Sequence, residues 1–151
     1  LLEPLHLTYD LLIFEKHLPQ TMRFVDQHPY QMFVVDHIAK PRIREGYLSP
    51  WREQIKELAR RENVYCKLSG IVTEADYTSW TEAEILPYME ITLEAFEPQR
   101  LMFGSDWPVC LVAVSYARWV DIASRLIGQL SESEQRRVWT DTAVEAYRLT
   151  G

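Results

Sequence analysis

Cysteine is scarce in this sequence, which holds only Cys66 and Cys110 among 151 residues. The two do not form a CxxC pair, and no zinc-type spacing of cysteine and histidine is present. We therefore expect buried free thiols in a cytoplasmic protein.

Long apolar runs and basic clusters are also lacking. No run approaches the ~20 apolar residues that a membrane helix needs, and the first residues form no signal peptide. The net charge is −6 without a basic stripe, which argues against nucleic-acid binding. A GxSxG elbow, a phosphate-binding loop and a GxGxxG motif are absent too. The expected partner is a small-molecule substrate, not a nucleic acid or a membrane.

What is present suits one globular domain over residues 1–151, with 47% hydrophobic and 25% charged residues. Strand-like runs alternate with helical patterns. The runs cover 7–14, 32–35, 64–70 and 101–106, and helices are expected near 51–61, 82–96 (disturbed at Pro87), 116–130 and 131–149. This alternation predicts an α/β fold with a parallel sheet, either an open doubly wound sheet or half of a barrel.

The best candidates for chemistry stand where strands end, because active sites of parallel α/β folds gather there. Side-chain alternation puts His37 on one strand face with Phe33 and Val35, and Asp106 on one face with Met102. If both faces point inward, His37 and Asp106 lie at the same open end of the fold. Such a pair can bind a metal or activate a water.

Each candidate also has a structural interpretation. Asp106 can cap a helix or a turn, and His37 can be an interior histidine. Lys67, inside an apolar strand, can form a buried ion pair or contact substrate. Lys40 can face a ligand or solvent, and Ser69 can belong to a plain turn.

Three segments then indicate a family. FVVDHIAKP at 33–41, VYCKLSG at 64–70 and LMFGSDWP at 101–108 resemble, in order and approximate spacing, segments of the amidohydrolase-2 family of (β/α)8 TIM barrels. The resemblance covers essentially the whole chain. It implies about four β/α units, the C-terminal half of a barrel, followed by a C-terminal helix.

The resemblance also implies a function, namely hydrolysis of a sugar or dicarboxylate lactone. Asp106 would take a proton from the attacking water, and His37 would polarise the lactone carbonyl. Both could hold a divalent metal, with zinc the first candidate, although some members work without one. Lys40, Lys67, Ser69 and Trp107 are the expected substrate-binding residues. The alternatives are a metal-dependent decarboxylase and a non-catalytic half-barrel that assembles with a partner chain.

One departure from the family is large, because this sequence contains no His-x-His strand. A complete barrel takes typically about 250 residues, so we expect the first strands to be missing and the chain alone to be inactive. Four strands cannot close, which predicts free edges at the first and fourth strands. It also predicts an exposed apolar face lined by Phe33, Val35 and Met102, and hence homo-oligomers through the sheet edges.

Overall fold

The computed structural model describes residues 2–149 and contains one parallel sheet of four strands. The strands lie in the order of the sequence: β1 (Tyr9–Leu11), β2 (Phe33–Val35), β3 (Val64–Leu68) and β4 (Leu101–Phe103). A doubly wound sheet reverses its strand order at a switch point, whereas a barrel adds each strand beside the preceding one. The sequential order therefore identifies a partial (β/α) barrel, and β1 and β4 are the edges, as predicted.

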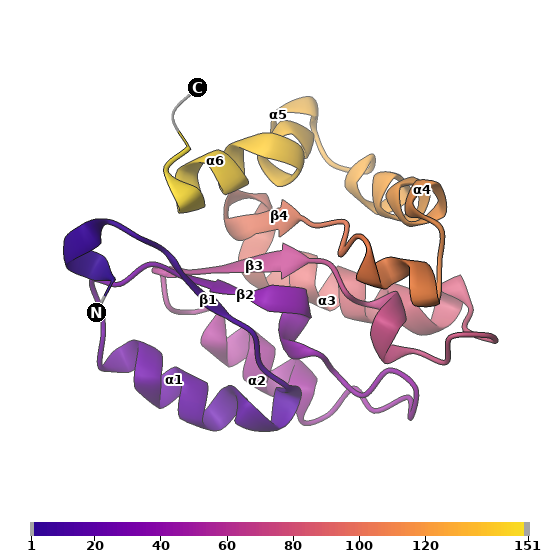
Figure 1. Ribbon diagram of the computed structural model, residues 1–151, viewed down its shortest axis with the longest axis horizontal. Helices are drawn as coiled ribbons and strands as arrows, with labels where there is room; N and C mark the ends of the chain where they lie inside the picture. Colours follow the sequence, from indigo (N-terminus) through magenta and orange to yellow (C-terminus); the bar gives the residue numbers. More distant parts are fainter. Residues whose placement is uncertain (1, 150–151) are drawn as a thin grey trace.

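Helices follow the strands and cover both faces of the sheet (Figure 1). The longer ones are α1 (Leu18–Asp26), α2 (Trp51–Leu58), α3 (Glu82–Arg100) and α4 (Tyr116–Ile127). The C-terminal helix consists of α5 (Glu132–Arg136), a π-helical turn (Arg137–Asp141) and α6 (Thr142–Tyr147). Short 3-10 turns at Glu3–Leu5, Glu15–His17, Asp36–Ala39, Val72–Glu74 and Val109–Val112 complete the chain.

The disturbance expected at Pro87 lies elsewhere in α3. The non-helical backbone is at Glu97, with φ 52° and ψ 166°. Glu97 precedes Pro98, whose ring clashes with a helical conformation of the residue before it. Pro87 lies in the second turn of α3, and the helix continues through it.

The main core lies between the sheet and helices α1 to α4, and it contains Phe33 and Val35. The opposite face of the sheet carries Val34, Tyr65 and Met102. The structure thus corrects the predicted assignment, because Phe33 and Val35 do not share a face with Met102.

The prediction of an exposed apolar face at Phe33, Val35 and Met102 was also wrong. The first two are 0% exposed and Met102 is 2% exposed. Helix α6 packs Ala146 against Met102 and its neighbours, on the side of the sheet opposite to α1 and α2 (Figure 1).

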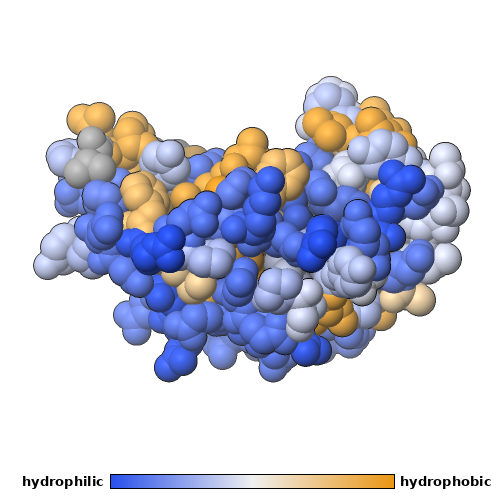
Figure 2. Space-filling view, turned by 90° about the horizontal axis from the view of Figure 1, so that it is seen from below, coloured by the Kyte–Doolittle hydropathy of each residue, from blue (hydrophilic) through white to orange (hydrophobic). Residues whose placement is uncertain are grey.

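Exposed apolar side chains gather instead beside β1 and in the segment after β4, and Figure 2 shows such residues in separate groups, mostly along one rim. The two sets are Leu5, Leu7, Tyr9 and Leu12, and Trp107, Val109, Leu111, Val112 and Tyr116.

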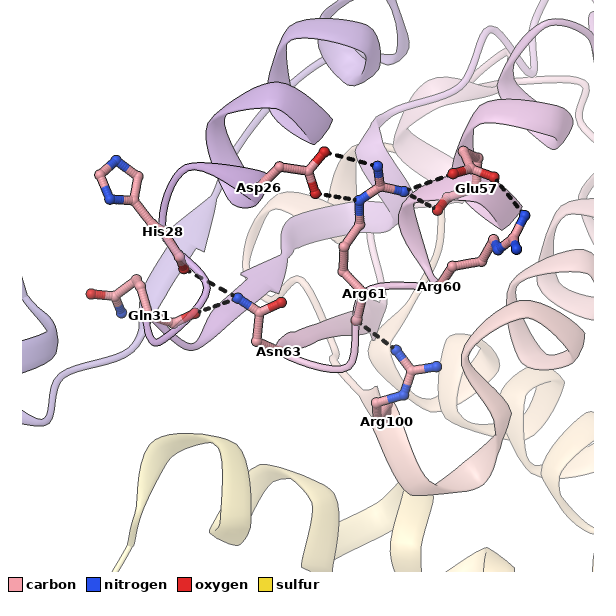
Figure 3. A network of polar contacts seen from close by, with 8 residues as sticks. All are labelled: Asp26, His28, Gln31, Glu57, Arg60, Arg61, Asn63 and Arg100. Atoms are coloured by element: carbon pink, nitrogen blue, oxygen red, sulfur yellow. Dashed lines mark hydrogen bonds and ion pairs between the residues drawn. The ribbon is translucent and has the colours of Figure 1, made fainter.

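A network of polar contacts joins helices and loops at the end of the sheet where the strands begin (Figure 3). Arg61 donates to both carboxylate oxygens of Asp26, at 3.0 and 3.1 Å, and also bonds Glu57. The side chain of Asn63 donates to the carbonyl of Gln31 at 2.8 Å. These contacts join α1, α2 and the start of β3. Among residues 2–149, no helix is long and apolar enough to cross a membrane.

The contact of α6 with the sheet can be tested by Met102→Ala. Removing this buried side chain should lower the free energy of unfolding by about 2–4 kcal/mol, measured by urea denaturation. Leu111→Ala, at a position 54% exposed, is the matched control and should change it by less than about 0.5 kcal/mol. Equal effects of the two substitutions would show that α6 does not cover Met102.

Candidate active site

His37, Ser69 and Asp106 meet beyond the ends of β2, β3 and β4. The Nδ1 atom of His37 lies 2.9 Å from the Ser69 hydroxyl, and its Nε2 atom lies 3.8 Å from Oδ1 of Asp106. The side chains of His37 and Asp106 are only 20% and 11% exposed. The structure thus brings together the histidine and the carboxylate that the sequence singled out, with Ser69 holding the imidazole from its other side.

The regular alternation of side chains along a strand does not explain why His37 approaches Ser69 and Asp106. After β2 the backbone of His37, Ile38, Ala39 and Lys40 turns left-handed, with φ of 52°, 48°, 62° and 46°. Such a conformation costs an L-residue about 1–2 kcal/mol and is most unusual for a β-branched residue such as Ile38. The left-handed turn, residues 37–40, carries the imidazole across to β3 and β4.

Burial and hydrogen bonds hold the left-handed turn in place. Ile38 and Ala39 are 0% exposed. The indole of Trp51, also fully buried, donates to the carbonyl of Ile38 at 2.8 Å, and the Lys40 amide donates to the carbonyl of His37 at 2.8 Å. Backbone strain at this level persists only where its surroundings fix it, which is common at functional sites.

Two glycines make room for the site. Gly70 has φ +61°, and a Cβ there would lie 2.6 Å from Cγ of His37. A Cβ on Gly104 would lie 2.8 Å from Cβ of Ser69. The glycines of the KLSG and FGSD segments therefore permit the approach of His37 and Ser69, a role that the sequence analysis did not assign to them.

Asp106 does not act as a helix cap among the described residues. The following 3-10 turn, Val109–Val112, has Pro108 at its N-cap position and no side-chain cap bond. Asp106 itself has φ 54°, and only its backbone carbonyl enters the turn, accepting from the Cys110 amide at 2.8 Å. The carboxylate is therefore free to face His37. The neighbouring Trp107 is 63% exposed.

Lys67 lies among carboxylates rather than beside His37. Its Nζ atom is 2.7 Å from Oδ1 of Asp36 and 3.1 Å from Oδ2 of Asp10, and Tyr147 donates to Asp10 at 2.6 Å. Burial lowers the pKa of Lys67, but Asp36 and Tyr147 outweigh it, so the pKa lies above its ordinary value. Lys67 thus forms the ion pair that was the structural interpretation, and substrate contact by Lys67 stays a prediction.

A cleft of about 750 Å3 lies next to this site. Lys40 lines it and pairs with Glu74 at 3.2 Å, while His37 and Asp106 are not among its lining residues. The other charged residues of this cleft could not be predicted from the sequence, since they stand in loops without a recognisable motif.

His37 and Asp106 alone do not fit a zinc site. Catalytic zinc takes three protein ligands, and no group of three His, Cys, Asp or Glu side chains within residues 2–149 could hold an ion. The pair offers two donors, so any further ligand would have to come from outside the described part of the chain.

Comparisons with known proteins identify the family of this chain. The sequence model of the amidohydrolase family matches residues 1–149. An L-fucono-1,5-lactonase of Burkholderia multivorans is 42% identical over 151 residues, with 93% of this chain and 51% of the relative covered. An L-fucono-1,5-lactonase of Burkholderia ambifaria is 34% identical, with 95% and 50% covered.

A solved structure is similar as well. It is the crystal structure of an amidohydrolase from Burkholderia multivorans with bound zinc, at 40% identity and a TM-score of 0.95, with 99% of this chain and 55% of that chain covered. The chain therefore belongs to the amidohydrolase family, and it spans about half the length of the curated relatives it matches.

Gly70→Ala tests whether the glycine makes room for His37. Both Gly70→Ala and the control Gly46→Ala place alanine at positive φ, but nothing lies within 4 Å of a Cβ at Gly46. Each should cost about 1–2 kcal/mol of stability from the backbone. Only Gly70→Ala should also shift the imidazole NMR signals of His37. Unchanged His37 signals in a folded Gly70→Ala protein would contradict the packing described.

Proposed function

We propose that this chain carries half of the active site of a lactone hydrolase, with Asp106 as the general base. The observation that supports this proposal is the approach of His37 and Asp106 at the carboxyl end of the sheet, where His37 Nε2 lies 3.8 Å from Asp106 Oδ1. Similarity to two L-fucono-1,5-lactonases supports a sugar lactone as the small-molecule substrate.

The proposed reaction needs one water and one cyclic ester. The Asp106 carboxylate accepts a proton from water as the water oxygen attacks the lactone carbonyl carbon. The carbonyl electrons move to the oxygen, and their return breaks the ring C–O bond. The proton on Asp106 then passes to the departing ring oxygen, so the product is an open-chain hydroxy acid and the carboxylate is restored.

His37 is proposed to polarise the lactone carbonyl through Nε2, because its Nδ1 is already engaged by the Ser69 hydroxyl at 2.9 Å. A hydrogen bond on one ring nitrogen fixes the ring's orientation and the role of the other nitrogen. Ser69 acts here through His37. Lys40 and Trp107 remain proposed substrate contacts at the rim of the site.

A divalent metal, with zinc as the first candidate, is proposed only for a complete barrel in which further strands, such as a His-x-His strand, supply additional ligands. When bound, such an ion would lower the pKa of a coordinated water to about 7. The steps above depend on Asp106 and His37 alone.

The free edges favour a second proposal, that this chain acts only when packed against further barrel strands. Within the described residues, β1 and β4 each pair on one side only, and apolar side chains lie exposed beside both. Light scattering distinguishes a homo-oligomer from a monomer that needs a different partner.

Asp106→Asn tests the proposed base in a complete barrel, made by replacing the matching half of the Burkholderia multivorans lactonase with this chain. The chimera should open L-fucono-1,5-lactone, and Asp106→Asn should lower kcat by about 10²–10⁴-fold while folding is kept.

Asp121→Asn is the matched control, since Asp121 is an exposed carboxylate of α4 that pairs with Arg125. It should leave kcat unchanged. Full turnover by the Asp106→Asn chimera would remove Asp106 from the mechanism.

A further inference from the structure

The cleft beside the candidate site is built from three loops that follow β1, β2 and β3. Its charged lining consists of four cationic and three acidic side chains: Lys16, Lys40, Arg42 and Arg44, and Glu15, Glu45 and Glu74. The cleft thus has a positive balance in a chain whose net charge is −6. Its volume of about 750 Å3 is typical of small-molecule sites.

Arg42, a cation of the cleft, is fixed from two sides. Its Nε donates to Oε1 of Glu15 at 2.6 Å, and its guanidinium lies 4.8 Å from the centre of the Tyr47 ring. Glu15 is only 8% exposed, so it is a firm anchor. A guanidinium held in this way loses little freedom when it binds a ligand.

The outer edge of the same guanidinium is available. Its two terminal nitrogens donate no hydrogen bond to any residue of the described chain, 2–149, and the side chain is 50% exposed. Two parallel N–H groups match the two oxygens of a carboxylate. By contrast, Lys40 is paired with Glu74 at 3.2 Å and Arg44 with Asp76 at 3.4 Å.

Polar groups that suit hydroxyls lie in the same cleft. The side chains of Glu45 and Gln54 line it and make no side-chain hydrogen bond to another residue of the described part. A carboxylate accepts from a hydroxyl, and an amide both donates and accepts. The lining therefore suits a molecule with one carboxylate and several hydroxyl groups.

We propose that this cleft binds a small hydroxy acid, with the carboxylate on the terminal nitrogens of Arg42 and the hydroxyls toward Glu45 and Gln54. His37 and Asp106 are not among the residues that line the cleft, and binding requires no turnover. A lactone hydrolase releases a molecule of this class, so under the proposed function the cleft would retain product. The binding itself does not rest on that function.

Calorimetric titration of the whole chain with sodium D-gluconate tests the proposal. Gluconate should bind saturably at one site, and D-glucitol, with the hydroxyls but no carboxylate, should bind at least about tenfold more weakly. Arg42→Lys keeps the charge but loses the paired donors, and should weaken gluconate binding about tenfold. Absence of saturable gluconate binding, or equal binding of D-glucitol, would overturn the proposal.

Two control variants locate the site. Arg60 follows the end of α2, has a side chain that is 78% exposed, and is not among the cleft-lining residues, so Arg60→Lys should bind gluconate as the unchanged protein does. Asp106→Asn should also keep binding, and a loss there would place the ligand at His37 and Asp106 instead. Circular dichroism checks folding. In the unsubstituted protein, gluconate should shift the Arg42 Nε–H NMR signal, and a signal that does not move would contradict the assignment.

Discussion

The left-handed turn at residues 37–40 is the constraint on which the candidate site depends. A β-strand continued past Val35 would keep alternating its side chains between the helix layer and the opposite face. The turn breaks this alternation and directs His37 toward Ser69 and Asp106. Its backbone cost is offset by the complete burial of Ile38 and by the Trp51 indole bond, so stability at α2 is linked directly to the geometry of the site.

The sheet face opposite the main core carries apolar and charged side chains side by side. Val34, Tyr65 and Met102 form an apolar cluster with Ala146 of α6. Asp10 is paired with Val34 in the strand register, and Lys67 is paired with Met102, so the ion pairs of Lys67 with Asp10 and Asp36 adjoin this cluster. His37, Ser69 and Asp106 lie beyond the strand ends, where the histidine and the carboxylate take no part in those ion pairs. This arrangement separates residues that stabilise the barrel from those suited to chemistry.

Sequence reasoning predicted the parallel sheet, its edges and the His37–Asp106 pair, because strand patterns and segment resemblance are local signals. It assigned Phe33 and Val35 to the wrong face, since a run buried on both faces shows no alternation to follow. It also missed the role of α6, because Ala146 and its neighbours give no sign of which face they cover. A positive φ is unfavourable for a β-branched residue such as Ile38, and it is held here by the contact with Trp51. No local sequence pattern therefore predicts it. The cleft around Arg42 is formed by three loops that are far apart in the sequence, and no sequence pattern predicts it either.

The most direct test of this account is an NMR measurement of proton contacts from the imidazole of His37. We predict nuclear Overhauser effects from the ring protons of His37 to the α protons of Gly70 and to the β protons of Asp106. Contacts instead to side chains of the main core between the sheet and the helices, such as Leu68 of β3, without those to Gly70 and Asp106, would contradict this geometry.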